Sequence, residues 1–169
     1  MVTAPPQELH KWDNIVQAIA GQFNLDPIII LSQIWRECEE DVGNPCLTRF
    51  EPRYQYFWHP TKHALWESNL SWKKNREIAV NLLGHDEFLF QSTSWSLLQT
   101  MGAVARELGF LGTPEELCIP ETNIYYGCLH LSNLLRRAHG DYKMALLRYN
   151  NSVEYTIEVL RRAAILEQI

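Results

Sequence analysis

Glu37, close to the end of a strongly signalled helix, is the residue best placed to do chemistry. Residues 26–38 read DPIIILSQIWREC, in which Asp26 suits the N-cap and a proline follows in the first turn. Glu37 shares nearly the angular position of Ile30, so it lies at the edge of the apolar stripe of this helix. Desolvation, the helix dipole and the acids at 39–41 are expected to raise the pKa of Glu37. A carboxyl group with a raised pKa suits a general acid near neutral pH, although a glutamate at a helix end is more often a solvated surface residue.

A segment rich in aromatic residues follows this helix. It reads NPCLTRFEPRYQYFWHP and has no clean periodicity, so we expect an ordered loop or extended stretch. Its rings have two interpretations: packing against the domain, or a wall on which the apolar faces of sugar rings stack. The rings concerned are Phe50, Tyr54, Tyr56, Phe57 and Trp58.

The elements that must position these residues are predicted to be helices. Apolar periodicity predicts helices at 7–23, 26–38, 95–108, 120–138 and about 153–169, with a further one that begins at Asp141 and breaks at Asn150-Asn151. The N-cap of the helix at 95–108 is expected at Ser92, Thr93 or Ser94, and shorter helical pieces are expected at 63–66 and 73–83. No strand pattern is strong. The fold class predicted is therefore all-α, with about seven helices.

Length and composition favour one domain. The chain has 169 residues, of which 46% are hydrophobic, enough for a single core over residues 1–169. The stretch at about 50–90 is expected to be an insertion or lid. The net charge of -5 and the lack of a basic run argue against nucleic acid as partner. No apolar run is long enough for a membrane span, and no signal peptide is visible, so we expect synthesis in the cytoplasm.

Cysteines and histidines give no metal-binding pattern. The four cysteines, Cys38, Cys46, Cys118 and Cys128, show no C-x-x-C spacing, and we expect all of them to be reduced. His59 and His63 have the spacing of two ligands on one helical turn, but Pro60 and the lack of a third ligand argue against a site. We expect neither a metal nor a cofactor.

Four separate segments, taken in their order along the chain, match the pattern of a known protein family. They are LDPIIILSQIWREC, STSWSLLQTM, PETNIYYGCLHLSNLL and DYKMALLRYNNS, and together they cover most of residues 20 to 152. This set resembles the soluble lytic transglycosylase family, whose catalytic domain has the goose-type lysozyme fold. In the family, the first segment ends in Glu-Ser and the second ends in Gly-Leu-Met-Gln. The third contains Asn-Ile-x-x-Gly-x-x-Tyr-Leu, and the fourth contains Ala-Leu-x-x-Tyr-Asn-Ala-Gly. NPCLTRFEPRY and STSW look most like members encoded by bacterial viruses.

The resemblance implies a reaction on the glycan strands of peptidoglycan. Glu37 would protonate the bond between N-acetylmuramic acid and N-acetylglucosamine, then act as base while the muramoyl 6-hydroxyl closes a 1,6-anhydro ring. Tyr149 matches the tyrosine that positions the catalytic glutamate. The substrate-binding candidates are Gln99, Asn150, Ser94, Leu98 and Glu51. We expect a monomer that acts on the cell wall, either as part of a virion or after release at lysis.

The chain departs from the family pattern at three places. Cys38 stands where the family has serine, Ser96 where it has glycine, and Asn151-Ser152 where it has Ala-Gly. Ser96 matters most if that glycine lets a sugar approach the backbone closely.

Two alternatives stay open. A hydrolytic goose-type lysozyme needs a second carboxylate to activate water, for which Glu51 is the best candidate and Asp86 a poorer one. A local ion pair of Glu51 with Arg49 or Arg53 is the structural interpretation, and it is favoured. The other alternative is a non-catalytic glycan-binding or structural module of the same fold, for which the departures at Ser96 and Asn151-Ser152 are the only support.

Overall fold

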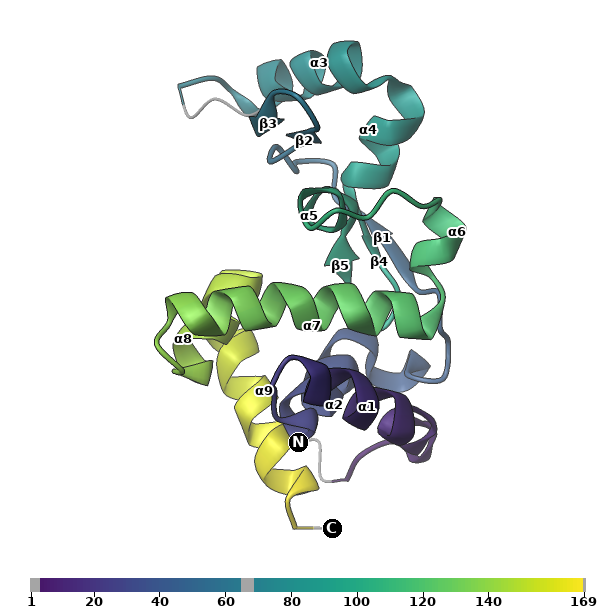
Figure 1. Ribbon diagram of the computed structural model, residues 1–169, viewed down its shortest axis with the longest axis vertical. Helices are drawn as coiled ribbons and strands as arrows, with labels where there is room; N and C mark the ends of the chain where they lie inside the picture. The colour runs from purple at the N-terminus through teal and green to yellow at the C-terminus, as the bar shows by residue number, and fades with distance from the viewer. Residues whose placement is uncertain (1–3, 65–68, 169) are drawn as a thin grey trace.

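The computed structural model describes residues 4–64 and 69–168, which form two lobes joined through α7 (Figure 1). We call the first the helical lobe: it holds the 3-10 helix η1 (Gln7–Trp12), α1 (Asp13–Gln22), α2 (Pro27–Cys38), the 3-10 helix η2 (Glu39–Asp41), α7 (Pro120–Arg137), α8 (Tyr142–Asn150) and α9 (Val153–Leu166). The second is the sheet lobe: it holds β1 (Thr48–Phe50), β2 (Trp58–His59), β3 (His63–Ala64), α3 (Trp72–Leu83), α4 (His85–Gln91), β4 (Thr93–Trp95), β5 (Thr100–Met101), α5 (Gly102–Glu107) and α6 (Pro114–Leu117).

Helix α2 is the centre of the helical lobe. Its N-terminus is fixed by Asp26, whose carboxylate accepts the backbone N–H of Ile28 at 2.9 Å. Ile30 and Ile34 are fully buried, and the helix packs more extensively against α9 than against any other described element. This confirms the helix and cap predicted for residues 26–38, and it fixes the direction in which the end of the helix points.

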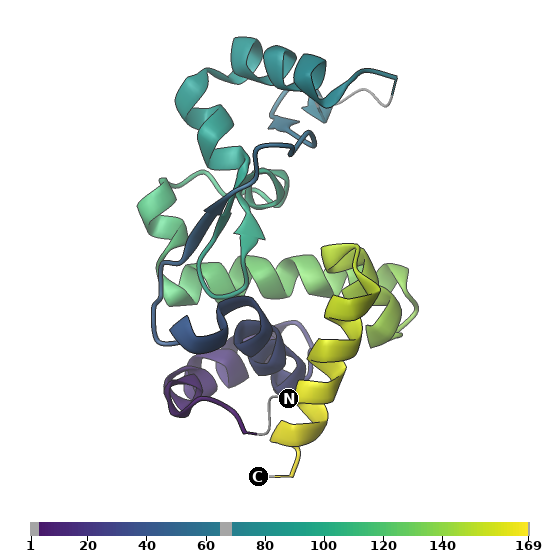
Figure 2. The ribbon, with the colours of Figure 1, turned by 180° about the vertical axis from the view of Figure 1, so that it is seen from behind.

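Helix α7 forms the side of the helical lobe that faces the sheet lobe, and the three-stranded sheet stands above it (Figure 2). Gly127, in the middle of this helix, is required by packing: a Cβ atom there would collide with the side chain of Leu98. Leu98 is only 1% exposed. The turn that carries Leu98 is therefore seated directly on α7.

The helix predicted at 95–108 is wrong for its first half. Residues 93–101 form a hairpin of β4 and β5, in which Ser94 pairs with Met101, and β1 completes the sheet on the other side of β4. The turn between the strands holds Ser96 and Gln99 in the left-handed region, with φ of 61° and 46°. The apparent helical spacing arose because this tight turn buries Leu97 and Leu98, and only 102–107 is helical.

The prediction for residues 50–90 was accurate in part. Helix α3 ends at Gly84 as expected, whereas α4 was not predicted. His63 and Ala64 form β3 rather than a helix, and the rest of the piece expected at 63–66 lies outside the described residues. This region has its own small core, made of Phe57, Ala79 and Phe88.

The all-α prediction therefore needs correction in detail. The described residues are mostly helical, but they form nine α-helices rather than about seven, and they include two small antiparallel sheets. The strands are two or three residues long, too short for the alternating pattern that reveals a strand in a sequence. No helix in 4–64 or 69–168 combines the length and apolarity that crossing a membrane requires.

One pair of cysteines contradicts the prediction that all four are reduced. Cys46 and Cys118 form a disulfide that spans 72 positions, with their Cα atoms 4.8 Å apart. It ties the loop before β1 to the junction of α6 and α7. Cys38 and Cys128 are free and buried. The disulfide was missed because two distant cysteines carry no spacing signal, so only the fold brings them together.

Candidate functional site

The candidate site is a groove of about 410 Å³ between the two lobes. Its lining comes from α2, the three-stranded sheet, the aromatic segment and the end of α8, and consists of Glu37, Arg49, Glu51, Arg53, Tyr54, Gln55, Tyr56, Ser94, Gln99, Met101, Tyr149 and Asn150. Four residues singled out in the sequence, Glu37, Gln99, Tyr149 and Asn150, thus lie on one surface although they are far apart in the chain.

The groove continues into a second hollow of about 480 Å³. The two share the side chains of Tyr54, Tyr56, Met101, Tyr149 and Asn150. The second hollow adds several residues from the aromatic segment, α5, α7 and α8: Phe57, Trp58, Ala64, Ala103, Val104, Glu107, His130, Arg148 and Asn151. Together they form an elongated depression, which suits a chain-like ligand better than a compact one.

Burial controls the acidity of Glu37. It raises the pKa of Glu37 from 4.5 to about 7, against the lowering effects of a hydrogen bond from Tyr155 and of the positive charges of Arg49 and Arg36. The raised pKa was predicted. The charges of described side chains that act on Glu37 are those of arginines, which lower its pKa, whereas the acids at 39–41 were expected to raise it. Of these three acids, Glu40 has a side chain outside the described part of the structure.

The hydroxyl that contacts Glu37 belongs to Tyr155, in the first turn of α9. Tyr149, for which the resemblance implied this role, instead donates its hydroxyl to the carbonyl oxygen of Leu98 at 3.1 Å. Sequence reasoning missed Tyr155 because it lies on the apolar stripe of the last helix. The available signal was that a buried tyrosine needs a partner for its hydroxyl.

Gln99 lies at the groove with its amide already engaged by the protein. Its Nε2 donates to the carbonyl oxygens of Leu47 at 3.1 Å and Ser96 at 2.7 Å, and its Oε1 accepts the hydroxyl of Ser94 at 2.8 Å. These bonds hold the turn between β4 and β5 against the loop before β1. Gln99 and Ser94 therefore shape the floor of the groove.

The other two substrate-binding candidates differ in exposure. Leu98 is buried, and its side chain packs against Gly127. Asn150 is exposed at the last position of α8, where its side chain is open to solvent. Of this pair, Asn150 has a side chain accessible to a ligand.

Glu51 is held in an ion pair. Its carboxylate accepts the Nε–H of Arg49 at 2.8 Å, which is the structural interpretation favoured from the sequence. Glu51 nevertheless lines the groove together with Glu37. Asp86 is exposed on α4, in the sheet lobe.

The aromatic segment both packs and lines the groove. Phe57 is 1% exposed and belongs to the core of the sheet lobe, whereas Tyr56 is 51% exposed. Tyr54 and Tyr56 meet edge to face with ring centres 6.1 Å apart, and both line the groove. Tyr56 thus supplies an accessible aromatic surface in the groove wall.

The departures from the family pattern have local explanations. Ser96 is fully buried with φ of 61°, and its hydroxyl donates to the carbonyl oxygen of Pro45. Asn151 ends α8 in the left-handed conformation, with φ of 57°. Ser152 is the N-cap of α9, where its hydroxyl accepts the backbone N–H of Tyr155 at 3.2 Å. The polar side chains at these positions complete turns and caps.

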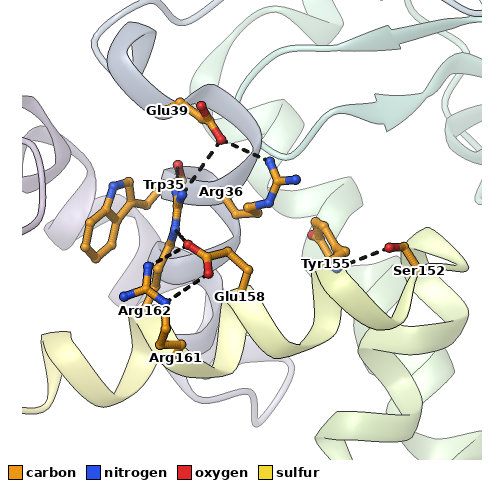
Figure 3. Close-up of polar contacts among 8 residues, drawn as sticks. All are labelled: Trp35, Arg36, Glu39, Ser152, Tyr155, Glu158, Arg161 and Arg162. Carbon is orange, nitrogen blue, oxygen red and sulfur yellow. Dashed lines mark hydrogen bonds and ion pairs between the residues drawn. The ribbon is translucent and has the colours of Figure 1, made fainter. Parts of the chain in front are cut away.

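Helix α9 also fixes the end of α2, as Figure 3 shows. Arg162, only 3% exposed, donates to the carbonyl oxygen of Trp35 and to Glu158, the latter at 3.0 Å. Its guanidinium group lies 4.9 Å from the centre of the Trp35 ring and 3.8 Å from the carboxylate of Glu39. A cation placed on the last carbonyls of a helix satisfies unpaired acceptors and suits the dipole. Glu37 therefore projects from a helix end that is held firmly in place.

Within 4–64 and 69–168, no group of three or more histidine, cysteine, aspartate or glutamate side chains is arranged to hold a metal ion. The groove instead presents one carboxyl group of raised pKa, aromatic rings and arginines. Comparison of the chain with protein-family models, with curated proteins and with solved structures gave no match.

Proposed function

We propose that the protein cleaves the β-1,4 bond between N-acetylmuramic acid and N-acetylglucosamine in peptidoglycan, as a lytic transglycosylase with a lysozyme-like fold. The observation that carries the proposal is Glu37, whose pKa burial raises to about 7, at the wall of an elongated groove. Near neutral pH a large fraction of this carboxyl group is protonated. It is therefore able to donate a proton to a glycosidic oxygen as the bond breaks.

The surroundings of Glu37 favour transglycosylation over hydrolysis. An inverting hydrolase needs a second carboxylate, set back from the acid, to activate water. Glu51 lies in the same groove, but Arg49 occupies its carboxylate at 2.8 Å. In the transglycosylase reaction the muramoyl 6-hydroxyl is the nucleophile, so Glu37 takes its proton and no second carboxylate is required.

The shape and chemistry of the groove fit a glycan strand. Its two hollows share five lining residues and follow one another, so several sugar units have room along the depression. Tyr56 and Tyr54 offer rings to the apolar faces of sugars. Arg53, Arg148 and Asn150 offer donors to hydroxyl and acetamido oxygens. With this substrate the protein would act at the cell wall.

The experiment is product analysis on isolated cell-wall sacculi. Incubation with the purified protein should release fragments with 1,6-anhydro-muramoyl ends, identified by mass, and the Glu37→Gln variant should release none. Fragments with reducing ends would instead identify a hydrolase, the second candidate, which the presence of Glu51 in the groove keeps open. The absence of any fragment would overturn both.

A further inference from the structure

A buried hydrogen-bond relay reaches Glu37 from behind the groove. The side-chain Nε2 of Gln33 donates to the hydroxyl oxygen of Tyr155 at 3.1 Å, and the same hydroxyl hydrogen-bonds to the carboxyl group of Glu37. A tyrosine hydroxyl carries one hydrogen. Because Tyr155 accepts a hydrogen bond from Gln33, its own hydrogen is free to point at Glu37.

The relay is built into the protein interior. Gln33 is 1% exposed and Tyr155 is 3% exposed, and Gln33 lies one helical turn before Glu37 on α2. Neither Gln33 nor Tyr155 is among the residues that line the groove. A ligand in the groove would therefore meet Glu37 while the relay supports it from the side of the core.

Gln33 occupies its buried position at a cost. Its Oε1 has no hydrogen-bond partner among the described residues. A buried acceptor without a partner destabilises a fold, and an apolar side chain at this place would avoid the penalty. Violations of this kind are expected at functional sites, where a polar group is needed for something other than packing.

We propose that Gln33 and Tyr155 are positioning residues for Glu37: Gln33 sets the direction of the Tyr155 hydroxyl, which holds the Glu37 carboxylate in place. This inference rests on the proposed function of Glu37 as the acid. A hydrogen bond to the carboxylate also favours its ionised form, so Tyr155 limits how far burial raises the pKa of Glu37. Tyr149 does not share this role, because its hydroxyl is committed to Leu98.

Other charged and titratable groups also face Glu37. They are Arg36 and Cys38 on its own helix, Arg49 on β1, Tyr149 on α8 and Tyr155 on α9, with Glu51 and Arg53 in the same groove. Among the contributions that lower the pKa of Glu37, the hydrogen bond from Tyr155 is the largest, followed by Arg49 and then Arg36. With Tyr155 removed, the two arginines remain, and the pKa of Glu37 should rise above its present value of about 7.

The test uses Tyr155→Phe and Gln33→Leu in the full chain. The pKa of Glu37 is measured by carbon NMR, and the rate of sacculus cleavage is measured across pH. In Tyr155→Phe, the pKa and the alkaline limb of the rate should both move up by about one unit, as expected for loss of a hydrogen bond to a charged group. Gln33→Leu keeps the Tyr155 donor but frees its direction, so the same shift should be smaller. The maximal rate should fall in both variants.

The matched control is Tyr142→Phe. The Tyr142 hydroxyl accepts the backbone N–H of Asp26 at 2.8 Å, at the opposite end of α2. The substitution removes a tyrosine hydrogen bond from the same helix, so this variant shows the general effect of such a loss on stability. The pKa of Glu37 should not change in it.

Each outcome decides the proposal. A folded Tyr155→Phe protein with the parent pKa at Glu37 would overturn it. If Tyr155→Phe does not fold, an unchanged pKa of Glu37 in Gln33→Leu would overturn the proposal instead. A parent protein that cuts no glycan would refute the proposed function, while the NMR titration would still decide whether the relay acts on Glu37.

Discussion

Burial of the Glu37 carboxyl group makes the stability of the protein depend on pH. The pKa of Glu37 rises from 4.5 to about 7 on folding. Between these values the folded state keeps a proton that the unfolded state has released, so stability falls as pH rises through this window and then levels off. Glu37→Gln removes the effect. We expect this variant to match the parent at pH 4 and to exceed it by about 3 kcal/mol at pH 8, as measured by urea denaturation.

The same carboxyl group should set the alkaline limit of activity. Glu37 must be protonated to act as the acid, so cleavage by the parent protein should decline as pH rises through about 7. His130, which lines the second hollow, is not the source of this limb, because burial lowers its pKa to about 4. Glu37→Gln should reduce the rate by at least roughly 10²–10⁴. Cleavage at the parent rate would show that the acid lies elsewhere, and Glu51 would be tested next.

The part of the site that one helix determines was predictable from the sequence. The place of Glu37 relative to Ile30 depends only on helical geometry, so its partial burial and raised pKa were expected. Its neighbours were not predictable, because Arg49 reaches it from β1 and Tyr155 from α9. The family pattern pointed to Tyr149 for this contact. Six positions along the chain separate two tyrosines whose hydroxyls have different partners, and only the fold tells them apart.

At the scale of elements, the contact between α2 and α9 holds in place the end of α2 that carries Glu37. We expect Arg162→Met to lower the free energy of unfolding by about 2–4 kcal/mol, because it leaves the Trp35 carbonyl oxygen and part of the Glu158 carboxylate without their buried partner. The loss should also lower the cleavage rate, since the end of α2 carries Glu37. Thermal unfolding and cleavage assays on the same samples measure both effects.

Arg161→Met is the control for that prediction. Arg161 contacts the same carboxylate, Glu158, at 2.7 Å, but it is much more exposed than Arg162. Ion pairs near the surface contribute little, so the change should be about 1 kcal/mol or less. Equal losses in the two variants would show that stability depends on the charge of Glu158 rather than on the contact with α2.

Helices with clear end signals were predicted well, and short strands were not. The predictions of α2, α8 and α9 are confirmed because Asp26, Asp141 and the break at Asn150-Asn151 mark where these helices begin. The hairpin at 93–101 was read as a helix because its apolar residues happen to recur at helical spacing. Its first strand, β4, pairs with β1 some 45 positions away (Arg49 with Ser94), and such long-range pairing has no local signature.

For the whole molecule, the groove depends on how the loop before β1 is attached to the rest. Pro45 and Leu47 supply the carbonyl oxygens that accept hydrogen bonds from Ser96 and Gln99 in the turn under the groove. The disulfide between Cys46 and Cys118 anchors this loop to the base of α7. The covalent link therefore supports the same turn that shapes the floor of the groove.

Removing the disulfide should therefore weaken both stability and activity. In the oxidised protein the link closes a loop of 72 positions, for which the loss of unfolded-state entropy predicts a stabilisation of up to about 4 kcal/mol. The double variant Cys46→Ser, Cys118→Ser should unfold at lower urea concentration by a corresponding amount. Its cleavage rate should fall too, because the loop is free to move away from Ser96 and Gln99.

Treatment of the parent protein with a thiol reductant should reproduce both effects and should leave the double variant unchanged. Cys38 and Cys128 are free and buried in both proteins, so the double variant controls for any effect of the reductant that does not involve the disulfide. A parent protein whose stability and cleavage rate do not respond to reductant would show that this link does not support the groove.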